Sequence, residues 1–141
     1  MTDEIRVIPP AHDPDDVWFW EGVREGRLLL QACADCGVVR HPPLPMCGAC
    51  HSTDWTTRES AGVGTVHSWI VSVPPGAPSG PGRIVVLVDL ADGVRFVANL
   101  VDTPVAAVAN GMTVRLEFRD YGGTVLPQFV PADPTADGGV A

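Results

Sequence analysis

Two pairs of cysteines constrain this chain more than any other feature of its sequence. Cys33 and Cys36 form the first Cys-x-x-Cys pair, Cys47 and Cys50 form the second, and ten residues separate the pairs. Two thiolates three positions apart can bind one metal ion from a single tight turn, and two such turns supply a tetrahedral set of sulfur ligands. Gly37 follows the first pair, where a backbone that turns back toward sulfur favours glycine. Because the four cysteines would fill every coordination position, the spacing predicts a small ribbon around a structural metal ion.

The ligand set favours zinc but leaves other chemistry open. Iron also takes four thiolates, as in rubredoxin-like centres. Two disulfides would fit a secreted protein, and a redox-active pair would need a βαβ unit, but the sequence indicates neither context. His41 and His51 lie close to the cysteines, yet four thiolates already complete the site. We therefore expect both histidines to be bystanders that hydrogen-bond around the metal site.

Composition bounds the fold and the partners. The 141 residues suit one ordinary domain, and 14 prolines and 15 glycines favour turns and short strands over long helices. Acidic residues outnumber basic ones 17 to 9, and the resulting formal net charge of −8 opposes binding to nucleic acid. Residues 1–10 lack the apolar stretch of a signal peptide, and the longest apolar run, residues 84–88, is too short to span a membrane. We therefore expect a cytoplasmic, reducing location.

A helix is predicted near the N-terminus. Asp13 can cap the first N–H groups, Pro14 suits the first helical position, and the helix would run to about Glu25 and stop at Gly26. Its apolar belt is wide and consists of Val17, Trp18, Phe19, Trp20 and Val23. Such a belt indicates contacts on more than one side of the helix. Two interpretations stay open: the tryptophans pack on their own domain, or another protein buries part of the belt.

The remaining chain is typical of β-structure. A short apolar strand over residues 27–32 leads into Cys33, and residues 52–62 are expected to be a polar link. Further strands are predicted over residues 65–73, 84–88, 94–100, 113–119 and 125–130. The continuous apolar run at 84–88 predicts a strand that is buried on both faces. Asp92-Gly93 predicts a hairpin turn, and the connector 101–111 is expected to hold a helical turn.

Five short strands with a longer link between the third and the fourth match an OB-fold barrel, although a small sandwich would show a similar pattern. The predicted fold is mainly β, with an N-terminal helix, a rubredoxin-like Cys₄ zinc ribbon and a C-terminal five-stranded OB-fold barrel. The predicted divisions are residues 1–32 for the helix and lead-in strand, 33–60 for the zinc ribbon, 61–131 for the OB-fold and 132–141 for a disordered tail.

Several short motifs, in this order, resemble one family. They are Phe19-Trp20-Glu21-Gly22, Gly26-Arg27-Leu28, Gln31-Ala32-Cys33-Ala34-Asp35-Cys36-Gly37, Pro42-Pro43, Cys47-Gly48-Ala49-Cys50, Gly62-Val63-Gly64-Thr65-Val66, Ser68-Trp69, Val86-Leu87-Val88-Asp89-Leu90 with Gly93, and Gly111-Met112-Thr113-Val114. The chain resembles the domain-of-unknown-function family of OB-fold, zinc-ribbon, acyl-CoA-associated proteins over residues 18–131. It departs from the family pattern at Leu44, where a basic residue is common, and at Gly48, where proline often follows the cysteine.

The resemblance implies a helper subunit in which catalysis resides in a partner. Members of the family associate with thiolase-like enzymes, which include thiolases, acyltransferases and the retro-aldolases of steroid side-chain breakdown, and some pair with hydratases of the hot-dog fold. The family implies a hetero-oligomer in which the helper stabilises the enzyme and helps to form its acyl-CoA channel. The departure at Leu44 weakens any contact with phosphate or CoA at that position.

What the residues lack is consistent with a helper. The sequence has no Ser-His-Asp order with a nucleophile elbow, no Gly-rich phosphate loop and no open metal site, so no catalytic residues are assigned. His67 and Ser68 are neighbours in a predicted strand and are expected to face opposite ways, which rules them out as a catalytic pair.

Three further hypotheses are weighed against the helper. A single-stranded nucleic-acid module would need a basic groove with stacking aromatics, for which the candidates are Trp69, Phe96, Phe118, Tyr121 and Phe129. An electron carrier would hold iron in the ribbon. Direct acyl-CoA binding is opposed by the acidic charge, but Arg83, Arg95, Arg115 and Arg119 are candidates for phosphate contacts at a shared interface. The loop at residues 74–82 is the candidate for contacting a partner or substrate, and a plain solvated loop is its alternative.

Overall fold

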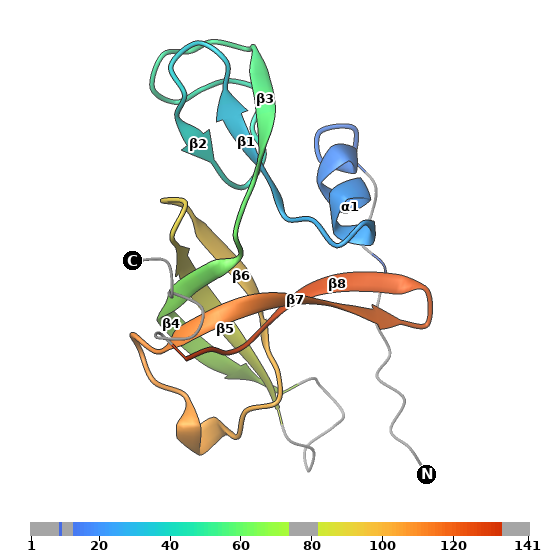
Figure 1. Ribbon diagram of the computed structural model, residues 1–141, viewed down its shortest axis with the longest axis vertical. Coiled ribbons are helices and arrows are strands. Elements are labelled where there is room, and N and C mark those ends of the chain that lie inside the picture. The colour runs from blue at the N-terminus through green and yellow to red at the C-terminus, as the bar shows by residue number, and fades with distance from the viewer. Residues whose placement is uncertain (1–8, 10–12, 74–81, 134–141) are drawn as a thin grey trace. The chain divides into compact units, whose positions relative to one another are not determined.

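The computed structural model describes residue 9 and residues 13–73 and 82–133 (Figure 1). The predicted disordered tail lies outside the described residues from position 134 onward, and so does the loop 74–82 apart from Gly82. The described chain forms two compact units. The first contains residues 13–59 and 118–127, and the second contains residues 60–117 and 128–133.

The first unit begins with helix α1 (Val17–Arg24). The helix starts later than predicted because residues 13–16 form a separate turn, in which the N–H of Asp15 donates to the carboxylate of Asp13 at 3.0 Å. Asp16 rather than Asp13 is therefore the residue before the helix. Gly26 ends it as expected, with a φ of 74° that glycine adopts without strain.

A small three-stranded sheet follows, composed of β1 (Leu29–Cys33), β2 (Val39–Arg40) and β3 (Trp55–Glu59) in the order β2-β1-β3. Both pairings are antiparallel, and Cys33 lies opposite Trp55. Strand β3 corrects the prediction of a polar link, because all five of its residues are exposed and give no hydrophobic alternation to read. In β1, the central strand, Leu30 is fully buried.

The second unit contains most of a closed barrel, of which residues 118–127 are grouped with the first unit. Its strands are β4 (Val63–Ser72), β5 (Arg83–Leu90), β6 (Arg95–Leu100), β7 (Thr113–Tyr121) and β8 (Thr124–Pro131). They follow the order β4-β5-β6-β8-β7 around the barrel, and β6 and β8 run parallel with Leu100 opposite Phe129. The 3₁₀ helix η1 (Val105–Ala107) lies in the long link between β6 and β7, as predicted. This arrangement confirms the five-stranded OB-fold barrel.

The barrel core is apolar and closely packed. Val66, Val86, Val88, Val114 and Phe129 are at most 2% exposed. The rings of Phe96 and Phe129 meet edge to face at 6.1 Å between centroids. Strands β4 and β5 approach so closely at Gly64 that an added Cβ would lie 2.4 Å from the carbonyl oxygen of Asp89.

The outer face of β5 differs from its prediction. Residues alternate along the strand, with Val86 and Val88 buried in the core and with Val85 and Leu87 half-buried on the other side. The strand is therefore buried on one face only. The apolar run of residues 84–88 supplies two faces. One is buried in the core, and the outer one is apolar but only half-buried.

Among the described residues, none of the helices combines the length and the hydrophobicity needed to cross a bilayer.

Candidate metal centre

The two cysteine turns have the same backbone geometry. In the first, the N–H of Gly37 donates to the carbonyl of Cys33 at 3.0 Å, and Gly37 has a φ of 78°. In the second, the N–H of His51 donates to the carbonyl of Cys47 at 2.9 Å, and His51 has a φ of 65°. The sequence signalled the first turn through its glycine. The second adopts the same left-handed conformation with a histidine.

These turns bring the four sulfur atoms together. All four Sγ atoms lie within 4.8 Å of one another, with 3.5 Å between Cys33 and Cys50 and 3.6 Å between Cys36 and Cys47. A tetrahedral zinc site with Zn–S bonds of about 2.3 Å requires sulfur atoms about 3.8 Å apart, so the donor set fits such an ion. No disulfide joins these cysteines.

Backbone N–H groups point at the buried sulfur atoms. The N–H of Cys36 lies 3.5 Å from the Sγ of Cys33 and lowers the pKa of that thiol. The N–H groups of Cys50 and Ala49 lower the pKa of the Cys47 thiol to about 6. At Cys50 the N–H of Ser52 acts in the same direction, but the Cys33 thiol and desolvation outweigh it and raise the pKa to about 12. A central cation is what would allow all four groups to be thiolates at once.

A polar contact ties the two turns together outside the sulfur cluster. The hydroxyl of Ser52, which follows the second turn, donates to the carboxylate of Asp35 in the first turn. The N–H of Cys47 donates to the carbonyl of Ser52 at 2.9 Å, so the second turn is closed by the same residue.

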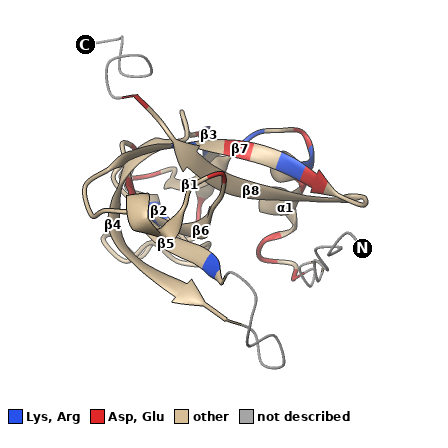
Figure 2. Ribbon diagram, turned by 90° about the horizontal axis from the view of Figure 1, so that it is seen from below, with Lys and Arg blue, Asp and Glu red and all other residues tan. Residues whose placement is uncertain are grey.

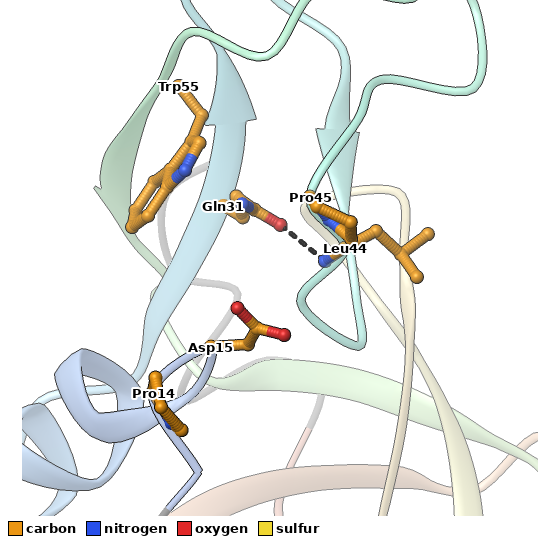
Figure 3. A pocket seen from close by; sticks show the side chains of 6 residues that line it. All are labelled: Pro14, Asp15, Gln31, Leu44, Pro45 and Trp55. Carbon is orange, nitrogen blue, oxygen red and sulfur yellow. Dashed lines mark hydrogen bonds between the residues drawn. The ribbon is translucent and has the colours of Figure 1, made fainter.

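A buried arginine positions the segment between the two turns, and sequence reasoning missed it. Arg40 is 8% exposed, and its Nε donates to the side-chain oxygen of Gln31 at 3.0 Å while its Nη2 donates to the carbonyl of Leu44 at 3.0 Å. The N–H of Leu44 donates to the same Gln31 oxygen at 2.8 Å, as the dashed line in Figure 3 marks. Gln31 and Arg40 face each other across β1 and β2, a register that the sequence does not reveal.

This polar cluster borders a small hollow of about 70 Å³. Its lining residues, drawn in Figure 3, are Pro14, Asp15, Gln31, Leu44, Pro45 and Trp55. Small-molecule pockets usually measure about 300–1,000 Å³. The hollow is therefore much smaller than a site that would enclose a ligand such as an acyl-CoA.

The aromatic belt of α1 packs within its own unit. The rings of Trp18 and Trp55 lie 5.1 Å apart, and the Nε1 of Trp18 donates to the carbonyl of Asp15 at 2.9 Å. The Phe19 ring lies 5.6 Å from the imidazole of His41, whose pKa is lowered by burial. These contacts favour the interpretation in which the tryptophans pack on their own domain.

On the barrel, a β-bulge changes the relation of His67 to Ser68. The register between β4 and β5 shifts between Val66 and Ser68, and both His67 and Ser68 are exposed. The expectation that they face opposite ways is therefore wrong, because a bulge interrupts strand alternation. His67 turns to Asp89, with 3.1 Å between its Nδ1 and the carboxylate.

Two of the four candidate phosphate-binding arginines of the barrel contact acidic neighbours. Arg95 donates from Nε to Asp89 at 2.9 Å, and Arg115 lies 3.1 Å from Glu117. The contact with Arg95 is the largest cause that lowers the pKa of Asp89, and His67 acts in the same direction.

Together, the four-sulfur ribbon and the five-stranded barrel define the class of zinc-ribbon and OB-fold proteins. Residues 20–56 match the family model of the ChsH2 rubredoxin-like zinc ribbon domain, and residues 57–119 match that of the ChsH2 C-terminal OB-fold domain. The chain belongs to this ChsH2, or DUF35, family, which is the family that the sequence motifs resemble.

Three relatives illustrate the similarity. A chain of the solved structure "Ltp2-ChsH2(DUF35) aldolase" is 40% identical, with a TM-score of 0.81, and the match covers 88% of this chain and 99% of that one. The "Probable enoyl-CoA hydratase alpha subunit" of Thermomonospora curvata is 40% identical over 127 residues, which are 89% of this chain and 40% of the relative. The "3-oxo-4,17-pregnadiene-20-carboxyl-CoA hydratase alpha subunit" of Mycobacterium tuberculosis is 37% identical over 123 residues, which are 84% of this chain and 38% of the relative. This chain thus spans about two fifths of the length of the two hydratase subunits.

Proposed function

We propose that this chain is a non-catalytic subunit of a thiolase-like, acyl-CoA-processing complex. The observation that carries the proposal is its similarity, over 99% of the other chain, to a chain solved in an aldolase complex. The two hydratase relatives are also subunits by name. The chain matches two fifths of each of them, so the proposal assigns hydration to neither the ribbon nor the barrel.

In this proposal the ribbon holds one structural zinc ion on Cys33, Cys36, Cys47 and Cys50. The fit of the sulfur spacing supports zinc, and four protein ligands leave no position for substrate. When bound, the ion would cross-link the two turns. The residues around it hold the backbone of the ribbon in place. Arg40 and Gln31 fix the backbone of Leu44, and Ser52 and Asp35 join the turns from outside. Metal analysis of the purified protein separates the alternatives: one zinc per colourless chain supports this account, and a red, iron-containing chain supports the electron carrier.

The partner we propose is a thiolase-like aldolase that acts on the acyl-CoA of a steroid side chain. The names of the aldolase structure and of the Mycobacterium tuberculosis relative support this choice. Within the complex the chain stabilises the enzyme and helps to form its acyl-CoA channel.

Co-expression with a thiolase-like aldolase tests the proposal. We expect the two proteins to elute as one complex of defined mass, and we expect cleavage of a steroid acyl-CoA to require both. Turnover by the purified chain alone would contradict the helper role, and so would an enzyme that is fully active and does not associate with the chain.

The nucleic-acid alternative loses two of its five stacking candidates. Phe96 is 3% exposed and Phe129 is fully buried, so neither ring can stack on a base. Along β7, basic segments stand next to acidic ones, as Figure 2 shows. Salt-sensitive binding to single-stranded oligonucleotides would restore this alternative.

A further inference from the structure

We propose that the outer face of β4, β5 and β6 is the surface on which the partner enzyme docks. This inference rests on the proposed function and adds the location. The docking face comprises Ile70 on β4, Val85 and Leu87 on β5, and Val97 on β6. Its occupant is a surface of the thiolase-like enzyme that presents an apolar side chain to these four residues and an acidic group to Arg95.

The pairing register makes the docking face continuous. Leu87 lies opposite Val97 on one side, and Val85 lies opposite Ile70 on the other. Neighbouring side chains on one face of a sheet contact one another across strands. A hollow of about 200 Å³ lies among them. It is lined by Ser68, Trp69, Ile70, Val85, Val86, Leu87 and Val97.

The exposure of this face is unusual for a barrel in water. Ile70 is 63% exposed and Val97 is 60% exposed, the two highest values among the large apolar side chains that the structure describes. An antiparallel sheet with one solvated face normally places polar residues there. A contiguous apolar patch with a polar border is instead typical of a protein–protein interface.

One end of the docking face carries a charged border. Asp89 and Arg95 lie opposite each other across β5 and β6, one alternation beyond Leu87 and Val97, and the β-bulge turns His67 onto the same carboxylate. Arg95 uses its Nε for Asp89, and its side chain is 56% exposed, so the guanidinium still presents positive charge to solvent.

This border selects among possible occupants. Arg95 together with Asp89 gives a local net charge of about zero on a chain of formal charge −8. An acidic group on a partner can therefore approach here with less repulsion than elsewhere. A second copy of this chain brings a further charge of −8 and is disfavoured. A strand of nucleic acid is disfavoured for the same reason.

Charge insertion at the centre of the face provides the test. We expect Ile70→Lys and Val97→Lys each to weaken binding to the co-expressed enzyme by at least about tenfold, since a buried, unpaired lysine costs about 1.4 kcal/mol or more. Val105→Lys is the matched control, because Val105 is also an exposed valine (44%) but belongs to η1 and not to the strands of the docking face. Its affinity should stay within about twofold of wild type.

Three further variants keep the test decisive. Ile70→Thr and Val97→Thr keep the β-branched shape, so they report on the docking face even where a lysine variant does not fold. They should weaken binding about threefold. Arg95→Gln should slow association and reduce its dependence on salt.

The possible outcomes distinguish a wrong docking face from a wrong helper role. A complex that forms equally well with wild type and with every variant would overturn the docking face and leave the helper role intact. An enzyme that does not bind the wild-type chain would overturn both. A wild-type homodimer that the lysine variants dissociate would assign the face to a second copy of the chain. Loss of oligonucleotide binding in the same variants would assign it to nucleic acid.

Discussion

His51 occupies in the second cysteine turn the position that Gly37 occupies in the first. Its φ of 65° lies in the left-handed region, where a side chain clashes with the backbone and costs about 1 kcal/mol. We expect His51→Gly to stabilise the metal-loaded ribbon by about 0.5–1 kcal/mol and to raise its unfolding temperature by a few degrees. Thermal unfolding with the metal in excess measures the change.

A substitution of the equivalent glycine in the first turn is the control. Gly37→Ala places a Cβ at a φ of 78° and should destabilise by about 1 kcal/mol, although nothing lies near enough to clash with that Cβ. A His51→Gly variant that binds metal more weakly would instead give the imidazole a role at the site.

Gly64 is required for a different reason, the close approach of two strands. A Cβ at this position would lie 2.4 Å from the carbonyl oxygen of Asp89 and 2.7 Å from a methyl group of Val88. Gly64→Ala should cost about 1–3 kcal/mol, because backbone oxygen cannot move aside as a side chain can. Gly48→Ala, with no atom within 4 Å of its Cβ, should change stability by less than about 0.5 kcal/mol. Urea unfolding of both variants compares them.

Asp89 links Arg95 and His67, and its titration reports on that contact. Arg95 first, and then the charge of His67, hold the pKa of the carboxyl below its usual 3.8. Because the folded pKa is depressed, the carboxylate contributes stability above about pH 3.8, and that contribution disappears as the pH falls through the lower folded value. Arg95→Gln should raise the pKa of Asp89 toward 3.8, which carbon-detected NMR titration can follow. An unchanged pKa would show that the guanidinium does not contact the carboxylate in solution.

At the scale of elements, we expect the ribbon sheet to depend on the proposed metal ion. Strands β1, β2 and β3 contain twelve residues in all, and Leu30 is the residue of this sheet with the largest fully buried side chain. A structural zinc contributes an apparent ~10–16 kcal/mol in small zinc-finger peptides, which exceeds what so small a core can supply.

Cys47→Ser should therefore release the metal and unfold the ribbon sheet. Cys47 is fully buried, and its sulfur lies 3.6 Å from that of Cys36. Metal content per chain and the amide dispersion of residues 29–33 are the measurements. Met46→Ser, at the half-exposed neighbouring position, should keep both. A Cys47→Ser chain that retains one metal ion with full affinity would contradict the four-sulfur site.

The elements also show how far sequence reasoning reaches. A continuous apolar run located β5, and alternation located β6 and β7, each within a few residues. Alternation could not locate β3, whose five residues are all exposed, and the apolar run misjudged β5, whose outer face is apolar without being buried. Cysteine spacing predicted the candidate metal site, because a local turn sets the geometry of each pair. The contact between Gln31 and Arg40 depends on strand register, which no local pattern encodes.

At the scale of the whole molecule, the first unit is discontinuous in sequence. Residues 118–127, at the turn between β7 and β8, group with residues 13–59 rather than with the rest of the barrel. A fragment that ends at Glu59 would therefore lack part of its own unit. We expect such a metal-loaded fragment to exchange its β1 amides faster than the full chain does, as hydrogen exchange with mass spectrometry can measure. Equal protection in both would mean that residues 118–127 add nothing to the stability of this unit.

The parallel contact between β6 and β8 has a consequence for synthesis. Strands β4, β5 and β6 are neighbours in both sequence and space, so they can pair as soon as they leave the ribosome. The barrel closes only when Phe129 reaches Leu100, and β8 follows every other strand along the chain. A nascent chain halted before β8 therefore exposes the inner face of an open sheet, and chaperones should bind it at that stage more than at any other.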